Sequence, residues 1–193
     1  ANLALAVGAG VASGSGLTVG HELGHKPDWP AQLGAKLVNA VTGYAHFCIE
    51  HNRGHHIMVA TPEDPASARF GENVYRFALR ELPGTARRGW AMERDRLTKK
   101  GLPFWHWRND LLQGYAITLA VAIALALWLG PWVMPFVVLH HFVGWLQLTL
   151  ANYVEHYGLL RRKLPSGRYE PCQPHHSWNT NHIASNLMLF HLQ

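Results

Sequence analysis

The sequence has little cysteine: only Cys48 and Cys172 occur among its 193 residues, far apart in the chain. This scarcity excludes a disulfide framework and a zinc site built from thiolates, because both need cysteines at paired spacing. Cys48 lies in an apolar helical context, where it is predicted to serve packing. No low-complexity tract or internal repeat is present, and the length suits one domain.

Charge is absent from two long stretches, residues 1–20 and the segment from Leu111 to Val154. The second stretch is long enough for two spans of roughly 20 residues each, and Gly130-Pro131 marks the predicted turn between them. The first stretch is rich in Gly, Ala and Ser, which allow membrane helices to pack closely. These features predict an all-α, polytopic helical membrane protein.

The charge that is present concentrates between these stretches. Residues 61–110 hold ten of the seventeen Lys and Arg residues together with seven acids, within a net charge of +5. An excess of Lys and Arg near span ends favours the cytoplasmic side. This segment is therefore expected to face the cytoplasm.

Three shorter patterns add local detail. Residues 35–49 predict a short apolar helix that ends at a histidine cluster. A further apolar stripe predicts a surface helix; it consists of Val74, Phe77, Ala78 and Leu82. The aromatic residues of LPFWHWRND (102–110) predict an interfacial belt, with a buried aromatic cluster as the alternative.

Fourteen histidines are the most unusual feature of the composition. HELGHK places His21 and His25 four residues apart, on one face of a helix. His21-Glu22-x-x-His25 is also the zinc-protease signature, in which Glu22 would act as general base. EHNRGHH and NYVEHYG add His51, His55, His56 and His156.

Six histidines are more than one metal can use while it keeps an open position, so the pattern predicts two metals. The predicted ligands are His21, His25, His51, His55, His56 and His156. Imidazole suits several transition metals, and a histidine-rich pair below an apolar membrane pocket favours iron. The site is expected at the cytoplasmic ends of the helices.

Other polar residues near these motifs are predicted to orient the metal ligands rather than to bind the metal. Glu22, Glu50 and Glu155 each follow or precede a predicted ligand on a different helical face, which suits partners that orient the ligands. In PHHSWNTNHIASN, such a role is favoured over ligation for His175, His176 and His182, with Asn179 helping to orient the site. His140 and His141 are either functional or hydrogen-bonded between helices. His46, His106 and His191 are assigned structural roles.

HELGHK, EHNRGHH, TPEDPASAR and NYVEHYG together resemble the integral-membrane alkane hydroxylases (alkane 1-monooxygenases) of the histidine-box superfamily of membrane desaturases and hydroxylases. The resemblance runs from about His21 to Gln193. It implies a six-span fold in a bacterial inner membrane, with a non-haem di-iron centre facing the cytoplasm. It also implies terminal hydroxylation of medium-chain n-alkanes, using dioxygen and electrons from rubredoxin and its NADH-dependent reductase.

The resemblance also bears on the extent of the chain. The sequence begins without Met and ends in the apolar run LMLFHLQ, which predicts a piece of a longer protein. The family's third histidine box would follow directly. Residues 1–193 are expected to form one membrane-embedded catalytic domain, incomplete at both ends. Its parts are 1–56 with two boxes, the cytoplasmic segment 57–110, the membrane hairpin 111–154 and the cytoplasmic segment 155–193.

The expected partners are rubredoxin, an alkane and membrane lipid, with no nucleic acid. The basic surface from Arg76 to Arg108 suits an acidic electron donor, with anionic lipid as the alternative contact.

Two classes of rival function stay open at this point. One is a related histidine-box enzyme, either a xylene-type methyl hydroxylase or a fatty-acyl desaturase. The desaturases usually space the second box H-x-x-H-H, whereas this chain has H-x-x-x-H-H. The other is an intramembrane zinc protease, which would leave the second box and His156 without a role.

Overall fold

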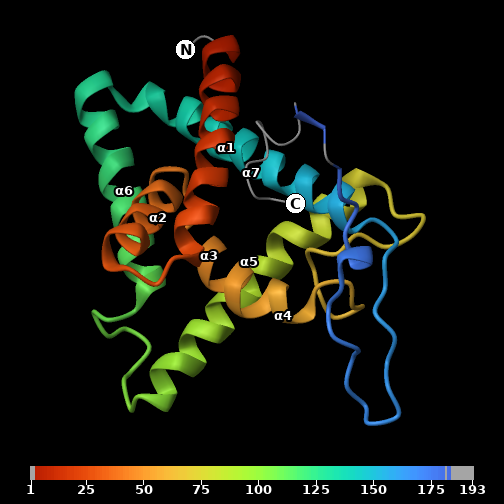
Figure 1. Ribbon diagram of the computed structural model, residues 1–193. Helices are drawn as coiled ribbons and strands as arrows, with labels where there is room; N and C mark the ends of the chain where they lie inside the picture. The colour runs from red at the N-terminus through yellow and green to blue at the C-terminus, as the bar shows by residue number, and fades with distance from the viewer. Residues whose placement is uncertain (1–2, 181, 184–193) are drawn as a thin grey trace.

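The computed structural model describes residues 3–180 and 182–183, and Figure 1 shows helices joined by turns and loops over that range. The prediction of an all-α chain is confirmed for this part, where the β-structure is a single isolated bridge between Lys163 and Tyr169. His191 lies outside the described residues. The helical elements are α1 (Leu3–His25), α2 (Trp29–Val41), α3 (Phe47–Glu50), the π-helical turn η1 (His51–His55), α4 (His56–Met58), α5 (Val74–Lys99), α6 (Asp110–Leu129), the 3-10 turn η2 (Pro131–Val133), α7 (Met134–His156) and the 3-10 turn η3 (Pro174–His176).

Three helical segments of the described chain are long and apolar enough to cross a membrane: Leu3–His25, Asp110–Leu129 and Pro131–His156. The predicted turn is where it was expected, since α6 ends at Leu129 and Gly130 takes a φ of +85° before η2. The protein is a membrane protein. Trp105 and Trp107, just before α6, are largely exposed, as an interfacial belt requires.

The two spans after Asp110 do not pair closely with each other, which differs from a simple hairpin. Instead, α7 packs mainly along α1 and crosses it, while α6 stands apart beside α2 (Figure 1). Small residues explain this choice: a Cβ on Gly10 would lie 2.6 Å from the Cβ of Val143. Polar contacts add to it, because Gln147 Nε2 donates to the Gly10 carbonyl at 3.1 Å.

The histidines within α7 also serve this helix packing. The His140 Nε2 lies 2.6 Å from the Ser13 hydroxyl, and His141 Nε2 lies 3.1 Å from the Val41 carbonyl. Both are therefore hydrogen-bonded between helices, which was one of the two predicted roles.

The prediction of one continuous helix over 35–49 is wrong. Asp28 caps α2 by accepting from Ala31 N, and α2 ends at Val41. Gly43 then takes a φ of +68°, a backbone conformation that favours glycine, and the chain turns before α3 begins at Phe47. Apolar periodicity alone did not reveal this break in the helix. Because of the break, α3 and η1 turn beneath the end of α1 (Figure 1).

Helix α5 runs beneath the spans and supports the second histidine cluster. Asn73 caps it by accepting from Arg76 N. The predicted apolar stripe is on its inner side, where Phe77 is fully buried and Leu82 packs against the core. That core consists of Leu17, Tyr44, Phe47 and Leu148. It joins α1, α3 and α7 immediately beside the histidines.

Candidate metal centre

The first histidine pair occupies the last turn of α1. His21 and His25 are four residues apart, and their Nε2 atoms lie 3.0 Å from each other. Pro27 follows the helix end, as expected after a helix terminus. The last carbonyls of α1 need partners, and Asn52 Nδ2 donates to the Gly24 carbonyl at 2.8 Å. This bond ties the first histidine box to the second.

The second box is built on a π-helical turn, His51–His55, rather than on a regular α-helix. In an α-helix, residues five apart point about 140° away from each other, because each residue turns the helix by roughly 100°. In η1 the His56 N–H bonds instead to the His51 carbonyl, five residues back. The wider turn brings the ring centroids of His51 and His56 to 4.4 Å.

Four histidines converge on one point. The ligand atoms of His21, His25, His51 and His56 all lie within 4.8 Å of one another. His55 and His156 form a neighbouring pair with ring centroids 4.9 Å apart. A pocket of about 530 Å³ is shared by both groups, and its walls include His21, His51, His55, His56 and His156. The structure therefore brings together all six residues that the sequence nominated.

Histidine ring nitrogens without hydrogen-bond partners indicate whether these residues could bind a metal. Within the described residues, the buried His21 Nδ1 and His51 Nε2 have no hydrogen-bond partner, and neither does either ring nitrogen of His156. Burial lowers the pKa of His51 well below its ordinary value, and the neighbouring histidines lower it further. Buried, neutral imidazoles with free lone pairs are the form that binds transition metals. The cluster could hold a metal ion.

Comparison of the sequence with known proteins identifies the family of this chain. The sequence profile of the fatty acid desaturase family matches residues 1–193. The chain belongs to the fatty acid desaturase family.

Within this family, the similar curated proteins are monooxygenases. The alkane 1-monooxygenase of Pseudomonas putida is 52% identical over 191 residues, which are 99% of this chain and 48% of that protein. The alkane 1-monooxygenase 1 of Alcanivorax borkumensis is 53% identical over 191 residues, covering 99% and 47%. The xylene/toluene monooxygenase hydroxylase component XylM of Pseudomonas putida is 28% identical over 184 residues, covering 89% and 48%. The resemblance to alkane hydroxylases is confirmed, and the chain spans about half the length of the curated relatives it matches.

The residues predicted to support the ligands of this desaturase-family site differ in their placement. Glu155 lines the pocket and accepts from the Ser177 hydroxyl at 3.0 Å. Asn179 also lines it, while its Nδ2 donates to the Pro174 carbonyl. Glu22 is half-buried and His182 exposed, and neither lines the pocket in the described part of the chain. Their supporting roles stay predictions.

The remaining histidines are already engaged or exposed. His176 lines the pocket, but its Nδ1 accepts from Gln173 N at 3.0 Å and its Nε2 lies 3.4 Å from Glu170. This fits a supporting role better than ligation. His175 is exposed. His46 is buried, with Nδ1 2.7 Å from the Tyr115 hydroxyl, which is consistent with its structural assignment.

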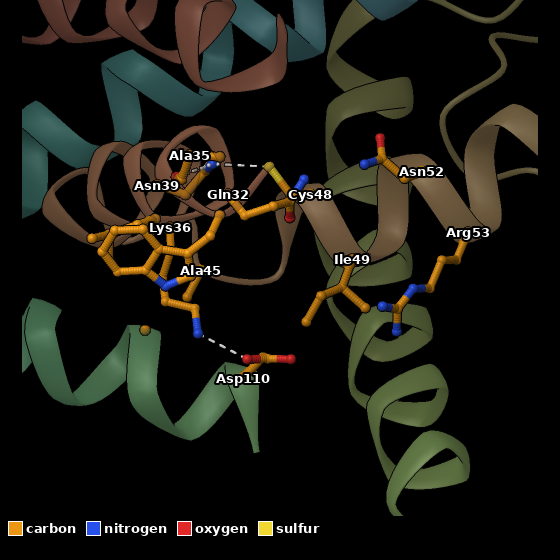
Figure 2. A pocket seen from close by; sticks show the side chains of 13 residues that line it. Gln32, Ala35, Lys36, Asn39, Ala45, Cys48, Ile49, Asn52, Arg53 and Asp110 are labelled. Atoms are coloured by element: carbon orange, nitrogen blue, oxygen red, sulfur yellow. Dashed lines mark hydrogen bonds and ion pairs between the residues drawn. The ribbon is translucent and has the colours of Figure 1, made fainter. Parts of the chain in front are cut away.

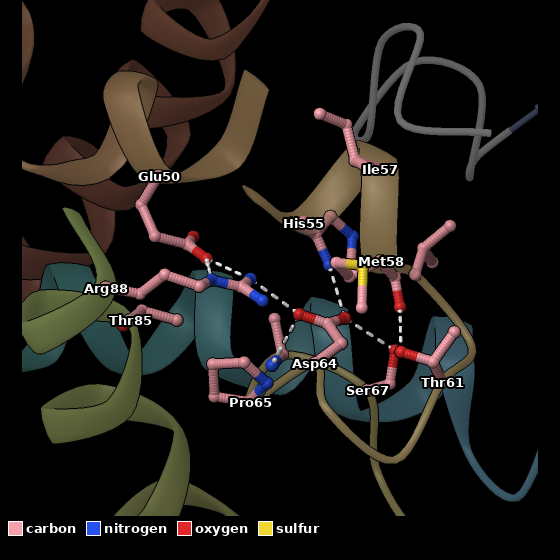
Figure 3. A network of polar contacts seen from close by, with 12 residues as sticks. Glu50, His55, Ile57, Met58, Thr61, Asp64, Pro65, Ser67, Thr85 and Arg88 are labelled. Carbon is pink, nitrogen blue, oxygen red and sulfur yellow. Dashed lines mark hydrogen bonds and ion pairs between the residues drawn. The ribbon is translucent and has the colours of Figure 1, made fainter. Parts of the chain in front are cut away.

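Sequence reasoning missed a polar network behind His55, shown in Figure 3. Asp64 is almost fully buried, and its Oδ2 lies 2.8 Å from His55 Nδ1. Arg88 from α5 donates to both Asp64 and Glu50, so Glu50 reaches His55 only through two other side chains. Burial alone would raise the pKa of Asp64, but its partners His55, Ser67 and Arg88 hold that pKa well below its ordinary range. The motif TPEDPASAR contains Asp64 and was the available signal.

A second missed acid is Glu81, which lies under the same region. It is buried between α5 and α7 and accepts from the Thr149 hydroxyl at 2.9 Å and from Asn152 Nδ2 at 3.4 Å. Burial raises the pKa of Glu81 to about 7, and the nearby Glu50 raises it as well. Asn152 also lines the histidine pocket. A carboxyl group with a raised pKa is thus one side chain removed from the centre.

A separate cavity of about 250 Å³ lies between α2, α3 and α6 (Figure 2). Lys36 and Asp110 form a 2.8 Å ion pair in its wall, and Asn39 Nδ2 lies 3.1 Å from the Cys48 sulfur. None of its described wall residues is a histidine, so it is distinct from the candidate metal centre. Cys48 also packs against Gly24, in agreement with its predicted packing role.

Proposed function

We propose that the full-length protein is a non-haem di-iron monooxygenase that hydroxylates the terminal methyl group of medium-chain n-alkanes to primary alcohols. The convergence of four histidines on one point, with two more beside them, is the observation that carries this proposal. The identity to curated alkane 1-monooxygenases supports the substrate class.

The residues divide into two candidate binding groups. His21, His25, His51 and His56 would hold one iron ion, and His55 with His156 would contribute to the second. When bound, the two ions would supply the reduction of dioxygen and the oxidation of the C–H bond. The histidines themselves would remain neutral and keep their lone pairs directed at the ions.

Apolar side chains beside the histidines suit a substrate that offers no hydrogen bond. The Phe47 ring stacks on His51 at 4.9 Å and lies 6.2 Å from His21. Leu17 and Leu148 pack against Phe47 in the buried core. These groups would keep water away from this side of the histidines.

The membrane setting follows the distribution of charge. The histidines lie at the ends of α1 and α7 that adjoin the basic segment 61–110. By the positive-inside rule, we assign this end of the spans to the cytoplasmic face of a bacterial inner membrane.

We also propose that rubredoxin, reduced by its NADH-dependent reductase, docks on the exposed basic side of α5. Arg87 and Arg94 flank Trp90 and Phe104 in a shallow pocket there. Arg88, although adjacent, is committed to the buried contacts with Asp64 and Glu50. Reversal of Arg88 would therefore disturb the interior and cannot report on docking.

The docking proposal predicts that Arg87→Glu lowers kcat/KM for rubredoxin by about tenfold at low salt, because a like charge would oppose an acidic partner. Iron content should stay unchanged, and the loss should shrink as salt rises. Arg168→Glu, an exposed charge reversal in the 155–180 segment, serves as the control. Equal rubredoxin kinetics for both variants would contradict docking at Arg87 and leave lipid contact as the role of this surface.

Two rival functions are separated by specific observations. The similarity to XylM keeps a xylene-type methyl hydroxylase as the second candidate. A zinc protease is disfavoured, because it would leave His51, His55, His56 and His156 without a role, although all four line one pocket with His21.

The deciding experiment is metal analysis of the full-length protein, purified from membranes in mild detergent. We expect about two iron ions per chain, with conversion of octane to 1-octanol when rubredoxin, its reductase and NADH are added. Preferential turnover of xylene in the same assay would replace the alkane by an aromatic substrate. One zinc ion and no iron would contradict the oxygenase.

A further inference from the structure

Asp64 is surrounded by four hydrogen-bond donors, two from the residues just after it, one from the second histidine box and one from α5. Its Oδ2 faces His55 Nδ1 at 2.8 Å and accepts from the Ser67 hydroxyl at 2.6 Å. Its Oδ1 accepts from Arg88 Nη2 at 2.7 Å and from Ala66 N at 3.3 Å. A carboxylate with every side occupied is held in one orientation, so its bond to His55 fixes the direction of that ring.

Arg88 links this carboxylate to a second one. Its guanidinium lies between Asp64 and the buried Glu50, which it also contacts through Nε at 2.6 Å. The side chain reaches them by passing Gly54 of the π turn, where a Cβ would lie 2.7 Å from Arg88 Nε. The absence of a side chain at this position in the second histidine box is therefore what admits Arg88 from α5.

We propose that Asp64 is a positioning residue for His55, held in turn by the Arg88–Glu50 pair. This inference rests on the proposed iron site. An imidazole that donates from Nδ1 keeps the lone pair on Nε2, so the bond to Asp64 selects the tautomer that can bind a metal through Nε2. The chain of contacts from Glu50 through Arg88 and Asp64 thus presents His55 to the pocket that it shares with His156.

The geometry explains why Glu50, although next to His51 in sequence, acts on a different histidine. It also distinguishes Asp64 from Glu63, its neighbour in the same motif. Glu63 is exposed and accepts from the Tyr169 hydroxyl at 2.8 Å, outside the histidine pocket. The two adjacent acids provide a matched pair for an experiment.

The test compares Asp64→Asn with Glu63→Gln in the full-length protein. Iron per chain and the rate of iron loss to a ferrous chelator are measured, together with the Mössbauer spectrum of ⁵⁷Fe-loaded protein. Outer-shell partners of metal ligands contribute 10–100-fold to metal affinity, so Asp64→Asn should lose iron about 10–100 times more readily. The spectrum should change at one iron site, while Glu63→Gln should resemble wild type.

Ser67→Ala controls for simple loss of stability. It removes a buried bond to the same carboxylate and leaves the contact between Asp64 and His55 in place. If Asp64→Asn does not fold, Arg88→Lys provides the second variant, because it keeps the charge but not the forked contact with Asp64 and Glu50. Arg88→Lys should lose iron faster than Arg87→Lys.

Four results would count against the inference. If Asp64→Asn keeps as much iron as Glu63→Gln, Asp64 does not position His55, and the proposed function still stands. The same conclusion follows if Asp64→Asn loses no more iron than an equally destabilised Ser67→Ala. Unchanged iron retention in Arg88→Lys would remove the contribution of the arginine. A wild-type protein without iron would overturn the proposed function, and this inference with it.

Discussion

Replacement of His51 by alanine is expected to abolish hydroxylation and to remove iron from the protein. His51 is central to the cluster, since its ring centroid lies 4.5 Å from that of His21, 4.4 Å from His56 and 5.1 Å from His55. Its buried Nε2 has no hydrogen-bond partner among the described residues. Loss of a direct ligand should exceed the roughly 10–100-fold effect of an outer-shell partner, so turnover should fall by more than about 100-fold.

His46→Ala is the control for this prediction. It makes the same chemical change at a buried histidine five residues earlier, whose ring contacts Tyr115 rather than the cluster. We expect His46→Ala to keep about two irons per chain even if it is less stable. A His51→Ala protein that retains both irons would contradict the assignment of this residue as a ligand.

The second large effect is expected from Gly10→Ala. A Cβ there would lie 2.6 Å from Val143 Cβ and 3.0 Å from the His140 carbonyl oxygen, so α1 and α7 would have to separate. Overpacking of this kind typically costs about 1–3 kcal/mol. Because α1 carries His21 and His25 while α7 carries His156, separation should also weaken iron binding.

Gly8→Ala gives the matched comparison. Nothing lies within 4 Å of a Cβ at Gly8, and alanine is the better helix former by about 1 kcal/mol. The midpoint temperature of thermal unfolding should therefore fall for purified Gly10→Ala. For Gly8→Ala it should rise or stay at the wild-type value. Equal stability of Gly10→Ala and Gly8→Ala would show that α1 and α7 do not touch at this point.

The local part of the site could be predicted from the sequence. Histidines four residues apart on a helix meet one another because helical geometry alone places them on one face. Long charge-free runs likewise identified the membrane spans, since the bilayer sets their length. His156 joins the cluster from a distant helix, and it was found only through its motif.

The parts that could not be predicted depend on contacts between distant segments. Arg88 meets Asp64 across 24 residues and Glu50 across 38. Periodicity describes neighbours within one helix, and it carries no information on which helix will lie opposite. The close approach of α7 to α1, rather than to α6, was hidden for the same reason, although the small residues of α1 indicated close packing with some helix.

The π turn at His51–His55 changes how the second histidine box should be compared with those of related enzymes. On an α-helix, H-x-x-H-H places its histidines at positions i, i+3 and i+4. Here they stand at i, i+4 and i+5, and the wider turn takes up the additional residue. The longer box is thus equivalent to the shorter one with a single inserted residue, accommodated without moving the downstream histidines to another face. Spacing alone therefore does not separate this chain from the desaturases, and an alignment of the two kinds of box needs a one-residue gap between His51 and His55.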